Sequence, residues 1–486
     1  MKLVVRGLGS LIKYGAYGVI YVLPLWVLFS FFALSLNRFG LSWSTSYSCA
    51  LVLSLVPIAI IEIFRGNLVN QINKLIQVIS ESRMSHSFIM VWAIIAIGLV
   101  VRLVWFFAFP AEMVSDSATY VELANRLITG RNFETADTFS YWPPGYPLFL
   151  YLVHLGSIEV SVNSLLVVNL SLFILTSILI FIVVKEHFSR SSAMVALVIF
   201  AIIPSLISLA GLAYKENVII FLLLLSLRVY FSKGFAFSPI KFCLVGFILG
   251  VASLIQPGLL LFVFVFIFTE IVRGISLSLF VKRFFAMLIA MLITISPWTI
   301  RNYFVFDEFV LISTNGGSNF YRANNELATG GYIKQGKIDL NHLSELEQNR
   351  EGSRLAKKWI KENPVDFLQL SFKKTVLFLG DDSSGVYESV KRGSKKEVSS
   401  FSYLILKTFS TGFWVLLWLV IWIERQNLKG LFGKPVFLAV SLSFLYFFTI
   451  HAVFESNGKY HLPVIWSLIV LVSVVVNSNK ASMPNR

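Results

Sequence analysis

Long apolar runs separated by short polar segments make up most of the chain. Runs of about 17–25 residues can cross a bilayer as helices, and such runs occur at 15–36, 41–64, 87–109, 162–184, 191–210, 214–232, 284–300, 402–423, 435–454 and 462–478. The apolar stretch 242–272 is too long for one helix and is interrupted by Gln256-Pro257-Gly258, so we expect two short helices there. The pattern predicts an all-α polytopic membrane protein with about twelve transmembrane helices.

Composition and charge predict how these helices are oriented. The 486 residues are 56% hydrophobic and carry 41 Lys and Arg against 26 Asp and Glu, a net charge of +15. The basic residues concentrate between alternate apolar runs, at 2–13, 65–83, 185–190, 233–241, 273–283, 425–434 and 480–486. Cytoplasmic loops carry such an excess, so we expect both termini and segment 65–86 in the cytoplasm. Because the basic residues are scattered, they do not indicate a nucleic-acid partner.

The polar segments divide the chain into parts. Residues 1–86 form a two-helix membrane extension with a cytoplasmic linker, and 87–300 form a transmembrane core that contains an outer loop at 110–145. Residues 301–401 form a larger outer loop, and 402–486 form the C-terminal transmembrane helices. Within the larger loop, 344–360 has a mixed-charge helical pattern that Asn363-Pro364 ends. The outer side should therefore carry loop helices as well.

Two acids stand where apolar helices meet the outer surface. Asp116 begins an amphipathic segment in the first outer loop, one helical turn from Tyr120, and a rigid turn, SYWPPGYPLF at 140–149, follows it. Glu216 opens an apolar helix at the same surface. A loop acid is usually solvated, and a helix N-terminal acid is favoured by the macrodipole. The alternative is a pair of carboxylates that serve one reaction.

Basic side chains near the same surface are candidates for binding phosphate. Arg102 lies inside an apolar helix, where arginine is costly and needs a partner. Arg301 follows Pro297-Trp298, and Lys459 and His461 lie in the last outer turn; an interfacial anchor explains each of these equally well. The six histidines lack metal-ligand spacing, and no glycine-rich phosphate loop occurs in a strand-helix context. A sugar donor should therefore be carried in the membrane.

Several segments resemble membrane glycosyltransferases of the GT-C class. They are SDSATYVELANRLITG, WPPGYPLFL, YKEN, LIQPG, SPWTIRNYFVFDEFVLISTNGGSNFYRANN and KYHLP, and the resemblance covers about residues 87–475. They are most similar to the bacterial branch of the dolichyl-phosphate-mannose protein mannosyltransferase and aminoarabinose transferase superfamily. The resemblance implies a GT-C helical bundle with one larger periplasmic loop.

The resemblance also implies an activity at the periplasmic face of the bacterial inner membrane. A sugar would pass, with inversion, from a polyprenyl-phosphate-linked donor to a glycolipid or cell-envelope glycan acceptor. Asp116 matches the family's first-loop acid and Glu216 its second, which would position the acceptor or a divalent cation; no other cofactor is implied. The donor phosphate would be bound by Arg301, Lys459, His461 and Arg102. The acceptor or sugar contacts would be Tyr120, Trp142, Tyr146, Asn315 and Tyr321.

The chain departs from the family pattern in its motifs. Asp116 is followed by Ser117 where the protein mannosyltransferases have Asp-Glu, which disfavours protein acceptors. Trp142 stands where relatives often have a basic residue. Lys459 stands where arginine is common; lysine keeps the positive charge but lacks the two-pronged guanidinium of arginine. The alternatives are a transporter or flippase for lipid-linked sugars and a non-catalytic relative. Against a transporter, the chain shows no paired half-repeats and has one asymmetric outer loop.

Overall fold

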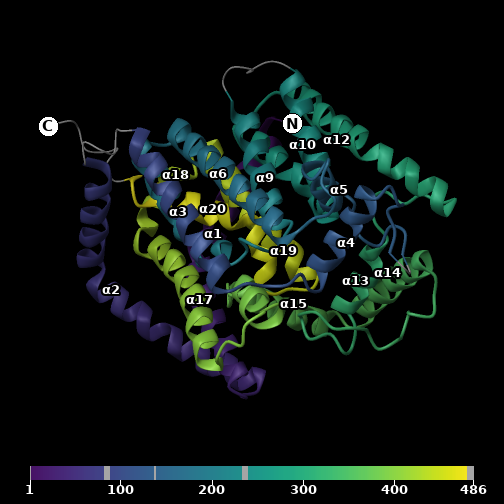
Figure 1. The fold of residues 1–486 in the computed structure, drawn as a ribbon. Helices are drawn as coiled ribbons and strands as arrows, with labels where there is room; N and C mark the ends of the chain where they lie inside the picture. The colour runs from purple at the N-terminus through teal and green to yellow at the C-terminus, as the bar shows by residue number, and fades with distance from the viewer. Residues whose placement is uncertain (1, 82–87, 136–137, 233–238, 479–486) are drawn as a thin grey trace.

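The structure, a computed structural model, describes residues 2–81, 88–135, 138–232 and 239–478 (Figure 1). Helices joined by loops account for these residues, and no β-strand occurs among them apart from a single bridge between Ala111 and Ser394. The all-α prediction is confirmed. Arg83, Lys233, Lys480 and Arg486, which belong to the predicted cytoplasmic segments, lie outside the described residues.

Among the described residues, eight helical segments are long and apolar enough to cross a membrane. They belong to α1 (Lys2–Arg38), α2 (Trp43–Glu81), α3 (Phe88–Ala108), α6 (Val162–His187), α12 (Leu277–Phe306), α17 (Ser400–Ile423), α19 (Pro435–Val453) and the combined η5 (Gly458–Val464) and α20 (Ile465–Val475). Shorter helices are α7 (Arg190–Ile202), α9 (Glu216–Phe231) and α10 (Pro239–Ile255). The chain is a multi-pass membrane protein, and the count of about twelve spans stays a prediction.

The helix breaks follow the local sequence. α10 ends at Ile255, and η2 (Pro257–Phe262) and α11 (Val263–Arg273) follow, as the Gln256-Pro257-Gly258 signal predicts. In contrast, the helix expected at 284–300 is longer at both ends. Ser276 caps its start, and it continues to Phe306 before Asp307 adopts a left-handed conformation, φ 52°. Arg301 therefore lies on a helix and not in the outer loop, which corrects the boundary expected after residue 300.

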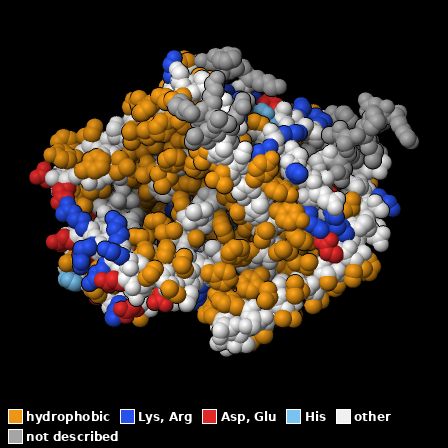
Figure 2. Space-filling model, turned by 180° about the vertical axis from the view of Figure 1, so that it is seen from behind, with side chains coloured by type: hydrophobic (Ala, Val, Ile, Leu, Met, Phe, Trp, Pro, Cys, Tyr) orange, Lys and Arg blue, Asp and Glu red, His pale blue; other side chains and the backbone are white. Residues whose placement is uncertain are grey.

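The main hydrophobic core surrounds α20, whose residues are all buried. α7, α17 and α19 pack around it, and α1 packs against α11, α15 and α17. Ile20, Leu23 and Val27 of α1 are buried in this same core. The first helix is thus integrated with the rest, while α2 lies along one side (Figure 1) and exposes most of its apolar residues. Figure 2 shows hydrophobic side chains over much of one face, as expected for a surface in lipid.

Further helices lie in the segments between the long apolar helices. They are α4 (Asp116–Ile128), α5 (Gly145–Val153), α8 (Pro204–Ile207), α13 (Asn315–Ala323), α14 (Glu345–Glu362), α15 (Pro364–Leu379), α16 (Ser384–Val386) and the π-helix η3 (Tyr387–Arg392). The predicted helix at 344–360 and its stop are confirmed, since Ser344 and Glu347 form a capping box and α15 begins at Pro364. Figure 1 shows α13 and α14 beside α4, on the side opposite α2.

A second, small core holds α13 to α14. Tyr321 is buried there with Leu340, Leu355 and Ala356. The helices approach at Gly317, where an added Cβ would lie 1.7 Å from the carbonyl oxygen of Asn349. No side chain fits there, so this glycine sets the spacing of the two helices.

Candidate active site at the N-termini of α4 and α9

An ion pair marks the start of α4. Lys459 Nζ lies 2.9 Å from Asp116 Oδ2. Burial by itself would raise the pKa of the Asp116 carboxyl, but Lys459, with Lys215 and Arg392, lowers it below its ordinary value. Ser115 precedes it with φ 54° and ψ −132°, a conformation that non-glycine residues rarely adopt. Asp116 is therefore ionised at neutral pH and held next to a cation.

Glu216, the first residue of α9, is the second acid of this site. Its side chain is 3% exposed, yet it forms no hydrogen bond or ion pair with any residue that the structure describes. Burial raises the pKa of Tyr146, and Glu216 raises it further; Glu216 also acts in that direction on Tyr120. The Glu216 carboxylate thus acts through space on these two tyrosines while making no hydrogen bond of its own within the described part of the chain.

Aromatic side chains join the two acids. The Tyr120 ring lies edge-on to Trp142 and to Tyr146, with centroids 5.5 and 5.2 Å apart. Burial raises the pKa of Tyr120, Lys215 and Lys459 lower it, and both acids raise it. Tyr120 therefore lies within the field of both carboxylates, and the structure brings Asp116, Glu216, Lys459, Tyr120, Trp142 and Tyr146 into one cluster.

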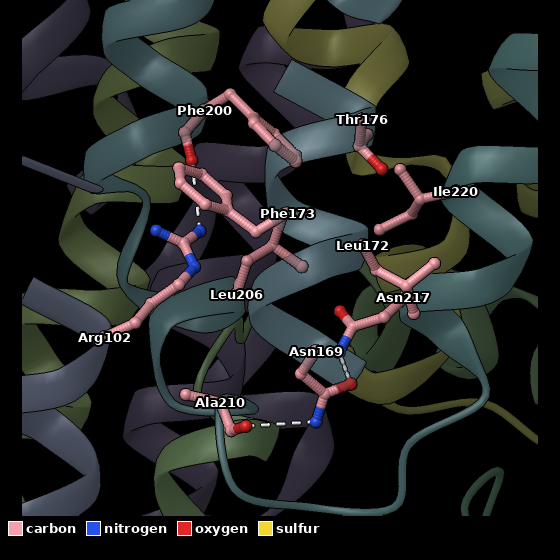
Figure 3. A pocket seen from close by; sticks show the side chains of 10 residues that line it. All are labelled: Arg102, Asn169, Leu172, Phe173, Thr176, Phe200, Leu206, Ala210, Asn217 and Ile220. Atoms are coloured by element: carbon pink, nitrogen blue, oxygen red, sulfur yellow. Dashed lines mark hydrogen bonds between the residues drawn. The ribbon is translucent and has the colours of Figure 1, made fainter. Parts of the chain in front are cut away.

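Asn169 of α6 positions the start of α9 (Figure 3). Its Nδ2 donates to the carbonyl oxygens of Ala210 and Leu212, at 3.0 and 2.9 Å, in the loop that leads into α9. Its Oδ1 accepts from Asn217 Nδ2 at 3.0 Å, next to Glu216. These side chains line a cavity of about 20 Å³, enough for one water molecule.

The proline turn is fixed by close packing on one side and by hydrogen bonds on the other. An added Cβ at Gly145 would lie 2.5 Å from the backbone nitrogen of Ile255, so the PPGYP turn and the end of α10 touch through a glycine. Glu345 accepts from the backbone N–H groups of Phe139 and Ser140 at 2.7 and 2.9 Å. The turn thereby presents Trp142 and Tyr146 to Tyr120.

Two of the predicted phosphate ligands have other partners. Arg301 donates to the carbonyl oxygens of Phe133 and Phe139 at 2.9 and 3.0 Å, so it fastens the first outer loop to α12. His461 is fully buried; its Nε2 lies 2.9 Å from Asp382 Oδ1, and its ring stacks on Trp414 at 4.1 Å. Arg301, Lys459 and His461 share no partner, so the structure does not gather them into one phosphate-binding set.

Arg102, Asn315 and Tyr321 also lie apart from the cluster. Arg102 Nη1 donates to the carbonyl oxygen of Ala201 at 2.8 Å, near the C-terminal end of α7, and its guanidinium lies 3.7 Å from the centroid of Phe173 (Figure 3). Its partners are backbone carbonyl oxygens and a ring instead of an acid, so Arg102 caps a helix end. Asn315 accepts from Ser313 Oγ at 3.0 Å, and Tyr321 belongs to the second core.

Sequence reasoning overlooked cations that act on Asp116. Lys215, beside Glu216, lowers the pKa of Asp116. Arg392 acts in the same way from η3, and π-helices often occur at functional sites. The YKEN motif could have indicated Lys215, whereas no local signal distinguishes Arg392.

Asp116 and Glu216 supply at most two acidic ligands. Among the described residues, no group of three or more His, Cys, Asp or Glu side chains could hold a metal ion. The cluster offers a charged carboxylate, a buried carboxylate, a lysine and three aromatic rings. Such a set of groups can orient a hydroxyl compound and accept its proton.

No family model matches the chain, and no curated protein matches it in sequence. Solved structures that resemble it include the Archaeoglobus fulgidus oligosaccharyltransferase in the apo form, with a TM-score of 0.47 and 11% identity over 83% of this chain and 52% of that one. The same enzyme tethered to an acceptor peptide containing the NVT sequon gives a TM-score of 0.46 and 10% identity over 82% and 51%. The chain spans about half the length of these proteins.

Proposed function

We propose that the chain is a GT-C class glycosyltransferase of the bacterial inner membrane. It moves a sugar from a polyprenyl-phosphate-linked donor to a glycolipid or cell-envelope glycan acceptor at the periplasmic face. The observation that carries this proposal is the pairing of two unlike carboxylates, the salt-bridged Asp116 and the unpartnered Glu216, around Tyr120 at the ends of apolar helices. A solvated loop acid and a simple helix N-terminal acid would have no reason to share one buried aromatic cluster.

The chemistry is a single displacement, which inverts the anomeric carbon. The acceptor hydroxyl oxygen forms the new bond to that carbon, and the bond from the carbon to the phosphate oxygen breaks. Its electron pair leaves on the phosphate, and the hydroxyl proton passes to a carboxylate. Asp116 is the base in this scheme. Lys459, 2.9 Å from it, holds the Asp116 carboxylate in place and keeps it ionised, and Glu216 orients the acceptor hydroxyl.

Substitution of each acid tests this assignment. Asp116→Asn and Glu216→Gln keep side-chain size but remove charge, and loss of a general base typically lowers turnover about 10²–10⁴-fold. Glu112→Gln is the matched control, because this nearby acid is largely exposed and lies 3.8 Å from Lys395. Release of polyprenyl phosphate from a radiolabelled lipid-linked sugar pool measures turnover by the purified protein. Near-native turnover of Asp116→Asn would remove it as the base, and sugar movement without phosphate release would favour a transporter.

A further inference from the structure

α13 and the outer turn before η5 lie side by side, next to the Asp116–Lys459 pair. Asn324 Nδ2 donates to the carbonyl oxygen of Val453 at 3.1 Å, and the rings of Phe320 and Phe454 are 5.3 Å apart. These contacts hold Arg322 of α13 and Glu455 of the turn in fixed positions. Tyr460, adjacent in sequence to Lys459, donates its hydroxyl hydrogen to Glu455 Oε1.

Arg322 and Glu455 each keep one buried polar atom without a partner. Arg322 Nη1 donates to the hydroxyl oxygen of Tyr141 at 3.4 Å and Nη2 donates to Asn319, but Nε has no hydrogen-bond partner among the described residues. Within the same part of the chain, Glu455 Oε2 has none either. Leaving a buried donor or acceptor unpaired costs about 1–3 kcal/mol.

The two side chains interact through space without direct contact. Burial alone would lower the pKa of Arg322, but Tyr141 and Glu455 raise it above its ordinary value. Even so, no ion pair joins Arg322 to Glu455 in the described structure. Because Phe320 packs on Phe454 and Asn324 binds the Val453 carbonyl, the free donor of Arg322 and the free acceptor of Glu455 lie on adjoining segments.

A hydroxyl group can both donate and accept a hydrogen bond. Two neighbouring hydroxyls of a sugar would satisfy Arg322 Nε and Glu455 Oε2 together. The guanidinium also lies over the ring of Tyr332, 5.4 Å from its centroid, and Tyr141 packs edge-on against Trp142 at 5.6 Å, so aromatic surface is available for the apolar face of a sugar ring. A phosphate fits less well, because the Glu455 carboxylate would repel it.

We propose that Arg322 and Glu455 form a saccharide subsite beside Asp116 and Lys459, which binds two adjacent hydroxyls of the sugar that enters the reaction. The identity of the subsite rests on the proposed function, but its ability to bind saccharide does not depend on turnover. Direct binding therefore separates failure of the subsite from failure of the proposed reaction.

Saturation-transfer NMR of the full chain in lipid nanodiscs, with methyl glycosides of the gluco, manno, galacto and arabino series as probes, measures this binding. We expect at least one glycoside to bind, and Glu455→Gln and Arg322→Lys each to weaken it about ten-fold or more. Monodeoxy derivatives of the bound glycoside should lose binding at two neighbouring positions. Tyr141→Phe, which keeps the ring and removes the hydroxyl partner of Arg322, provides a milder variant with a smaller loss.

The controls are Glu351→Gln and Arg354→Lys, an ion pair on an exposed face of α14, which should bind as the wild type does. Absence of binding by the wild type, or equal binding by the wild type and the Arg322 and Glu455 variants, overturns the subsite. Saccharide binding without phosphate release from the lipid-linked donor would retain the subsite and reject the proposed reaction.

Discussion

Replacement of Asn169 by leucine tests whether the helix start that carries Glu216 is positioned from α6. Asn169 Nδ2 donates to the carbonyl oxygens of Ala210 and Leu212, and its Oδ1 accepts from Asn217 (Figure 3). Leucine has the same number and branching of side-chain heavy atoms and makes none of these bonds. The substitution therefore removes hydrogen bonds with little change in packing.

The expected cost follows from the groups left behind. The carbonyl oxygen of Ala210 loses its partner in a buried setting, whereas the carbonyl oxygen of Leu212 still accepts from the Tyr214 backbone N–H and Asn217 is half-buried. An unpaired buried group costs about 1–3 kcal/mol, so Asn169→Leu should destabilise the protein by about that amount. Because the loop into α9 is no longer held, Glu216 should also lose its fixed position, and small displacements of catalytic groups lower turnover steeply.

The assay compares thermal unfolding in detergent with kcat and KM for the lipid-linked donor. We expect a lower Tm and a lower kcat with little change in KM, because Asn169 acts through Glu216 and not through the donor. Thr176→Val is the matched control: it lines the same cavity and does not hydrogen-bond to Ala210 or Leu212. If Asn169→Leu and Thr176→Val have the same Tm and kcat, the positioning argument is refuted.

Further outcomes are expected for topology, for Arg301 and for pH. A reporter fused after residue 350 should lie outside the cytoplasm, as the distribution of Lys and Arg predicts; cytoplasmic labelling would reject both the topology and the mechanism. Arg301→Ala should lower Tm and leave the KM for the donor nearly unchanged, because the guanidinium binds loop carbonyls. A ten-fold rise in donor KM, about 1.4 kcal/mol, at constant Tm would instead restore the predicted role of Arg301 as a phosphate ligand. Burial lowers the pKa of Lys374 to about 7, so the unfolded chain binds more protons than the folded chain between about pH 7 and 10.5. Thermal stability should therefore rise with pH across that window, and it should rise less steeply in Lys374→Met. Equal slopes for the wild type and Lys374→Met would contradict this.

Local sequence determined most of the helices. Most apolar runs of membrane length became helices, and Gln256-Pro257-Gly258 and Asn363-Pro364 ended helices where expected. The run expected at 191–210 is an exception, because its helix ends at Ile202, before Pro204. These signals need no distant partner, because proline removes a hydrogen bond within its own turn. The acids of the site were also recognisable, since Asp116 and Glu216 each begin a helix next to an apolar run.

Tertiary structure decided which charged groups meet. Lys459 and Asp116 are 343 residues apart and form an ion pair, whereas Arg301 binds loop carbonyls and His461 binds Asp382 in the core. Sequence position placed these basic residues near one surface but could not select their partners. A partner is selected by burial, because each polar group removed from water must be satisfied by whichever group the packed helices bring within hydrogen-bond distance.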